Sequence, residues 1–269
     1  MLAVVPFFLT LIVSFSTEKS VLDKGYSFFP QGFSLEAYRY VFSNNIIFNS
    51  YAISIFVTIV GTLLSVLICS MCAYTISLPK IKHRNKIALF LYLPTIFNAG
   101  MVPWYILVTK YLHLKNSLIG LILPYLVSAF MIFLLRNYFK SIPPSLTESA
   151  EMDGASPFFV FFRIIFPLSA PIVATVSLFI ALGYWNDWYL ALWLVDKQQL
   201  YPLQYMLYRI YSLIQYMAQT GGQLSGSQSV PNETIQVAMM FVTIGPIVLV
   251  YPFVQKYFIK GIMIGAVKG

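Results

Sequence analysis

Two polar stretches interrupt an otherwise apolar chain, and they hold the residues whose types could do chemistry. In the first, Glu148, Glu151 and Asp153 place three carboxylates within six residues, where they can pair with basic groups or remain solvated. The second, residues 185–188, combines two tryptophans with an amide and an acid, which are groups that bind sugars by stacking and by hydrogen bonds to hydroxyls. Neither stretch has the composition of a catalytic constellation, so we expect no catalytic residue.

Caps and turns predict how the first stretch is held. Ser145 and Glu148 form a capping-box pattern, which predicts a short helix starting there, with Glu148 acting at least as a cap. Gly154 suits a left-handed helix end, and Ser156 with Pro157 predicts the start of a second short helix. The prolines expected to bound these two helices are Pro143, Pro144, Pro167 and Pro171.

Composition places the chain in the membrane class, because 59% of its 269 residues are hydrophobic and only 10% are charged. The formal charge of +8 is carried mainly in short connections, which argues against nucleic-acid binding.

Cys69 and Cys72 have the spacing of a redox motif but lie in an apolar run, so we interpret them as small buried residues. His83 and His113 are isolated, and no metal site is expected.

The apolar runs predict an all-α integral membrane protein with six transmembrane helices. A cytoplasmic loop after the second span is indicated by Lys80, Lys82, Arg84 and Lys86, and the last lysines indicate a cytoplasmic tail. The expected spans are residues 1–16, 46–78, 87–108, 117–139, 169–195 and 234–254, the third being interrupted by Pro94, Gly100 and Pro103.

The domain organisation follows from these spans. We expect residues 1–45 to form the first span and an external connection, 46–256 the main transmembrane domain, and 257–269 a cytoplasmic tail. Within the main domain lie a cytoplasmic loop at 143–168 and an external segment at 196–233, whose Gly/Ser-rich part, 220–229, is expected to be flexible. Residues 1–16 could instead be the core of a signal peptide, and the absence of a preceding basic residue suggests that the natural start lies upstream of Met1.

The 143–168 loop resembles the EAA loop of ATP-binding-cassette importer permeases, and the chain looks most like the oligosaccharide (maltose-like) branch. Ser149 and Phe166 depart from the family pattern, which usually has alanine and leucine there. The resemblance implies a type I importer bundle in the bacterial cytoplasmic (inner) membrane, with the loop lying as a coupling helix in a groove of an ATPase. The residues that carry the resemblance are Glu148, Ala150, Gly154, Ile164 and Pro167.

The resemblance also implies partners: a homologous second permease, two ATPase subunits, an external solute-binding protein, membrane lipid and a carbohydrate solute. The chain has no phosphate-cradling Gly-rich loop with lysine, so ATP and magnesium are expected on the ATPase subunits and no cofactor on this chain. The residues expected to couple to the ATPase are Glu148, Ala150, Glu151, Asp153, Gly154 and Pro167.

Two further sets of residues carry open alternatives. Trp185, Asn186, Asp187 and Trp188 either line the substrate path or belong to an aromatic belt at the outer interface. Tyr205, Tyr208 and Arg209 either dock the solute-binding protein or lie on an interfacial helix. Other functions considered are import of an amino acid or glycerol phosphate, an ion-coupled secondary transporter, and a membrane enzyme. The last two are disfavoured by the lack of an internal repeat and of clustered ionisable residues.

Overall fold

The computed structural model describes residues 4–29, 32–43, 45–219 and 233–248, and these are helical apart from turns and one isolated antiparallel bridge between Ser16 and Phe33. The predicted cytoplasmic tail at 257–269, the Gly/Ser-rich part at 220–229 and the end of the sixth predicted span lie outside the described residues. The chain forms two compact units. Unit 1 comprises residues 1–54 and 187–250, and unit 2 comprises residues 55–186 and 251–269.

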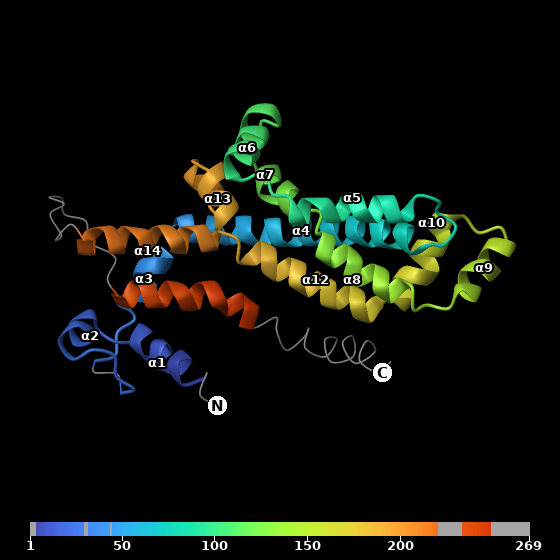
Figure 1. Ribbon diagram of the computed structural model, residues 1–269. Helices are drawn as coiled ribbons and strands as arrows, with labels where there is room; N and C mark the ends of the chain where they lie inside the picture. The colour runs from blue at the N-terminus through green and yellow to red at the C-terminus, as the bar shows by residue number, and fades with distance from the viewer. Residues whose placement is uncertain (1–3, 30–31, 44, 220–232, 249–269) are drawn as a thin grey trace. The chain divides into compact units, whose positions relative to one another are not determined.

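The central element of unit 2 is the greater part of α4 (Asn45–Ser77), which corresponds to the second predicted span (Figure 1). Its 33 residues extend about 50 Å at 1.5 Å per residue, which exceeds the hydrocarbon thickness of a bilayer. It is the one described helix that is long and apolar enough to cross a membrane by itself. The prediction of one continuous helix at 46–78, long and apolar enough to span a membrane, is therefore confirmed.

Two of the other predicted spans, 87–108 and 117–139, correspond to bent pairs of helices, and a third bent pair joins the end of the predicted 143–168 loop to the start of the span predicted at 169–195. Arg84–Ile96 and Met101–Tyr111 meet at 112°, because Gly100 has a left-handed backbone (φ 85°) between them. Leu118–Tyr125 and Ala129–Phe139 meet at 51°, and Pro157–Leu168 and Ala170–Trp185 meet at 84°. The described residues thus hold up to four spans if each pair counts as one, so the count of six stays a prediction. The elements in these pairs are α5 (Arg84–Ile96), α6 (Met101–Ile106), η1 (Leu107–Tyr111), α7 (Leu118–Ile122), η2 (Leu123–Tyr125), α8 (Ala129–Phe139), α10 (Pro157–Val160), η3 (Phe161–Ile165), α11 (Phe166–Leu168) and α12 (Ala170–Trp185).

Polar contacts hold the α7–α8 pair against α4, and a close approach at a glycine brings α12 against the same helix. The Ser65 hydroxyl donates to the carbonyl of Leu126 at 2.6 Å, where the α7–α8 pair is broken and leaves carbonyls without helical partners. A Cβ at Gly61 would lie 2.6 Å from the ring of Tyr184, so glycine is what allows α4 and α12 to pack this closely. Both cysteines are free thiols; Cys69 is buried beside the same break, as expected, whereas Cys72 is only half-buried.

Unit 1 has a separate core. The helices of this unit, besides the first residues of α4, are α1 (Val4–Ser14), α2 (Glu18–Lys24), α3 (Glu36–Ser43), α13 (Tyr189–Leu194), η4 (Gln198–Leu200), α14 (Leu203–Gln219) and a final helix, Glu233–Val248. Ala37, Val41 and Ile47 pack against the buried face of the final helix. Glu18 accepts hydrogen bonds from the backbone N–H and the hydroxyl of Thr234, which places a carboxylate at the start of the final helix, where the helix dipole favours negative charge.

The two apolar helices at the ends of the described chain are short. The described residues of α1 extend only about 16 Å, well below the roughly 30 Å of a hydrocarbon core. Both α1 and the final helix lie where the first and sixth spans were predicted.

Candidate functional site

The 143–168 loop folds as two short helices joined by a glycine turn. α9 (Pro144–Met152) ends at Asp153, and Gly154 then has a left-handed backbone with φ 82°. The Gly154 N–H donates to the carbonyl of Glu151 at 3.0 Å, and the Ala155 N–H donates to that of Ala150 at 2.9 Å. These two bonds form a Schellman motif, which satisfies carbonyls that the helix end leaves unpaired. The prediction for Gly154 is confirmed.

The boundaries of these helices differ partly from expectation. Ser156 caps α10 by accepting from the Phe159 N–H at 3.3 Å, as predicted. The capping box at Ser145 is wrong: α9 begins at Pro144 and its N-cap, Pro143, makes no side-chain cap. Proline has a fixed φ and no N–H, so it suits the first helical position and starts the helix before Ser145.

The second helical run ends within the predicted limits. The prolines expected to close it were Pro167 and Pro171, and it continues through a π-helical turn and α11 to Leu168, between the two. It stops at Ser169, whose backbone angles are not helical, and Pro171 lies within the first turn of α12, where proline is tolerated. Pro167 is exposed on α11.

The three acids of the loop lie in different surroundings. Glu148 is exposed, and so is Asp153 at the end of α9. Glu151 is half-buried and forms an ion pair with Lys80, which lies in the connection between α4 and α5. Sequence reasoning missed this pair, although a signal existed, because both residues were predicted on the same side of the membrane with opposite charges.

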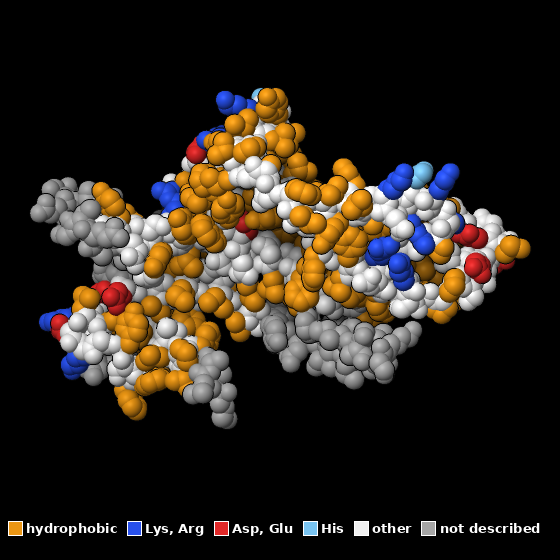
Figure 2. All heavy atoms as spheres, in the orientation of Figure 1, with side chains coloured by type: hydrophobic (Ala, Val, Ile, Leu, Met, Phe, Trp, Pro, Cys, Tyr) orange, Lys and Arg blue, Asp and Glu red, His pale blue; other side chains and the backbone are white. Residues whose placement is uncertain are grey.

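A hollow of about 530 Å³ separates α9 from the ends of the spanning helices in unit 2. Figure 2 shows the basic side chains and the acids of α9 gathered at this end. Burial, together with the positive charges of Arg136 and Arg84, lowers the pKa of the Lys140 ammonium. The walls therefore carry crowded positive charge opposite two carboxylates. The charged residues that line the hollow are Lys80, Arg84, Lys140, Glu148 and Glu151.

An apolar hollow of about 220 Å³ lies nearby, between the end of α4 and α10. Phe161 is buried and its ring centroid lies 5.3 Å from that of Tyr74 on α4, so this phenylalanine packs against the bundle. Phe158, Phe159 and Phe162 are exposed in the chain by itself.

The Trp185–Trp188 stretch does not lie within a continuous helix. The predicted span at 169–195 is wrong as one helix, because α12 ends at Trp185 and α13 starts at Tyr189. The Asp187 carboxylate explains the restart, since its oxygens accept from the Leu190 N–H at 3.3 and 3.4 Å and thus cap α13. Trp185 and Asn186 belong to unit 2, and Asp187 and Trp188 to unit 1. Whether the four residues line one path stays a prediction.

Within unit 1, the predicted docking residues join an aromatic cluster. The rings of Trp188 and Tyr208 stack with centroids 4.4 Å apart, and Tyr205 and Tyr208 lie nearly parallel at 6.4 Å. The Arg209 guanidinium donates to the Tyr201 hydroxyl at 2.7 Å and lies 5.0 Å from the centre of that ring. Trp188 of the predicted path thus contacts Tyr208 of the predicted docking surface, which no short-range spacing could indicate.

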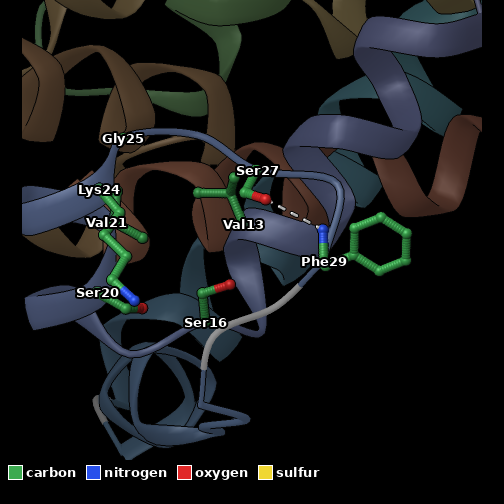
Figure 3. A pocket seen from close by; sticks show the side chains of 8 residues that line it. All are labelled: Val13, Ser16, Ser20, Val21, Lys24, Gly25, Ser27 and Phe29. Atoms are coloured by element: carbon green, nitrogen blue, oxygen red, sulfur yellow. Dashed lines mark hydrogen bonds between the residues drawn. The ribbon is translucent and has the colours of Figure 1, made fainter.

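Unit 1 has a hollow that is too small for a solute. It lies between α1 and α2 and is lined by side chains that include Val13, Ser16 and Phe29 (Figure 3). Its volume of about 10 Å³ is close to the minimum for a single water molecule.

Comparisons with known proteins give a family and relatives. Residues 84–264 match the family described as "Binding-protein-dependent transport system inner membrane component". The chain is 38% identical over 269 residues to the "Polygalacturonan/rhamnogalacturonan transport system permease protein YtcP" of Bacillus subtilis (strain 168), covering all of this chain and 94% of the relative. It is 37% identical to "Protein LplC" of the same strain over 100% of this chain and 90% of that one. A chain in the crystal structure of a bacterial ABC transporter involved in the import of the acidic polysaccharide alginate superposes with a TM-score of 0.83 at 32% identity, covering 95% of this chain and 91% of that one.

Proposed function

Because the chain belongs to the family of binding-protein-dependent transport system inner membrane components, we propose that it is the permease subunit of an ATP-driven oligosaccharide importer. It forms part of the translocation path in the bacterial inner membrane and performs no covalent chemistry. ATP and magnesium bind to two separate ATPase subunits, and an external solute-binding protein delivers the solute to this chain and a homologous permease.

The observation that carries this proposal is the exposed helix α9. None of its nine residues is buried in the chain by itself. An isolated helix of this length is only marginally stable in water, because few hydrogen bonds offset the cost of nucleation. A groove on a soluble partner supplies the missing contacts, and the 143–168 loop presents α9 beyond α10 at one end of unit 2 (Figure 1). This is the arrangement expected of a coupling helix that an ATPase subunit moves.

We assign the residues of the loop to coupling by their surroundings. Glu148 is exposed and pairs with a basic residue of the ATPase, while Gly154 and the carbonyl of Ala150 fix the turn that aims α9. Asp153 is exposed beside the turn. Closure of the ATPases pushes α9, and because α9 contacts α10, the push passes through the Pro157–Leu168 run, including Pro167, into α12. The bundle then opens outward to accept solute, and hydrolysis resets it.

The solute is an oligosaccharide released from a polysaccharide, and we propose the acidic class. YtcP is named as a polygalacturonan/rhamnogalacturonan transport permease, and the solved transporter is involved in the import of the acidic polysaccharide alginate. On this chain, Trp188 and the neighbouring residues of the 185–188 stretch supply aromatic and polar groups for the path. The cluster around Tyr205, Tyr208 and Arg209 supplies the docking surface for the binding protein. Uptake of oligogalacturonides against neutral maltooligosaccharides tests the solute class.

The test of the importer itself is co-purification with an ATPase. The chain is expressed with its neighbouring genes, and the captured complex is assayed for an ATP-binding subunit and for solute-stimulated ATP hydrolysis. Glu148→Ala should weaken capture or uncouple hydrolysis from uptake. Ser149→Ala is the matched control, because it is the adjacent exposed residue and should leave both unchanged. If the wild-type chain captures no ATPase, the proposed function is wrong.

A further inference from the structure

Lys80 and Glu151 form the one ion pair found among the described residues. The partners are 71 residues apart in the chain and both belong to unit 2. Lys80 lies three residues after the end of α4, while Glu151 lies in the last turn of α9. The pair therefore connects the long spanning helix with the coupling helix by a route that does not pass through α10.

This contact matters because α9 has few other constraints. None of its side chains is buried, so no core fixes its position on the chain. The contacts that hold it include its two covalent flanks, the packing of its end against α10 and the ion pair. Exposed ion pairs contribute little to the free energy of unfolding of a whole chain. For α9, which has few other contacts, a contribution of that size changes the equilibrium between its held and released positions by about two- to fivefold.

The charges around the pair decide which substitution of Lys80 tests it best. Arg84 and Lys140 line the same hollow, so replacing Lys80 by a neutral residue leaves other cations near Glu151. Reversing a charge is the sharper perturbation, because a carboxylate at position 80 repels Glu151 outright. Glu148 is exposed three residues earlier and has no ion pair in the described chain, so it remains available to a partner.

We propose that Lys80 is a positioning residue that holds the coupling helix through Glu151, so that α9 and the end of α4 move together when an ATPase pushes on the loop. This rests on the proposed function. It assigns the first cytoplasmic loop a part in transmission, in addition to its effect on membrane orientation. It also divides the acids of the loop, with Glu151 engaged within the chain and Glu148 facing the partner.

The test is a charge swap in the assembled complex. Lys80→Glu, Glu151→Lys and the double variant are purified with the partner subunits in proteoliposomes, and solute uptake is measured per ATP hydrolysed. Each single reversal should lower this ratio by about two- to fivefold while the ATPase stays bound, and the double variant should restore it. Lys82→Glu is the matched control, since it changes the charge of the same loop equally but lies outside the hollow.

The outcomes separate this inference from the proposed function. Single reversals that keep the wild-type ratio, or a double variant no better than the worse single one, overturn the role of Lys80 and leave the importer intact. Hydrogen exchange of the α9 amides provides a readout without any ATPase: it should speed up in the single reversals and recover in the double variant. Unchanged exchange in all three variants shows that the pair does not hold α9. Failure of the wild type to capture an ATPase overturns the importer itself.

Discussion

Replacement of Gly154 perturbs the 143–168 loop through backbone conformation alone. Gly154 has φ 82°, and a Cβ built at this position would meet nothing within 4 Å, so no steric clash contributes. The cost is that of a left-handed backbone for a residue with a side chain, about 1–2 kcal/mol, and more for a β-branched residue. That free energy disfavours the turn by about five- to thirtyfold. It also weakens the two hydrogen bonds from Gly154 and Ala155 that end α9.

We therefore expect Gly154→Val to lower uptake and coupled ATP hydrolysis by about tenfold, while Gly154→Asn stays near wild type because asparagine tolerates this conformation. Uptake and hydrolysis are measured in proteoliposomes at equal amounts of inserted protein. Gly25→Val is the matched control, because Gly25 also has a positive φ, of 72°, with open space around it, but lies outside the loop. Equal transport by the Val and Asn variants would contradict the reasoning, because the backbone at Gly154 would then not position α9.

Two further predictions concern packing and the break between α12 and α13. Gly61→Ala should lower the yield and melting temperature of the purified chain, because its Cβ would collide with the Tyr184 ring and such overpacking costs about 1–3 kcal/mol, whereas Gly183→Ala on α12 meets open space and should behave as wild type. Equal melting temperatures would show that α4 and α12 are less closely packed. Asp187→Asn should retain the cap of α13 and wild-type folding, while Asp187→Ala loses about 1 kcal/mol, since Leu190 then lacks its acceptor. If the Asn variant folds normally but fails in uptake, the carboxylate acts in the path in addition to capping α13.

Helix geometry in the loop could be predicted where it depends on nearby residues. The turn at Gly154 and the cap at Ser156 involve bonds spanning at most five residues, so the pattern of glycine, serine and proline indicated them directly. The break in the third predicted span at Gly100 follows from the same local rule. The start of α9 was misplaced because Pro144 and Ser145 both carry a signal for a helix start. The end of α12 at Trp185 was missed because the apolar run continues past Asp187.

By itself, the sequence determined the membrane class, the long span at 46–78, and the two short helices with their glycine turn, because hydropathy and capping are properties of neighbouring residues. Only the tertiary structure decided which distant residues meet: Lys80 with Glu151, Trp188 with Tyr208, and Glu18 with Thr234. In each of these pairs the partners have no regular spacing, and the folded path of the chain brings them together. The physical reason is that hydropathy, caps and turns depend on residues within one or two helical turns. A charged group or an aromatic ring can instead pair with any complementary residue that the fold brings near it.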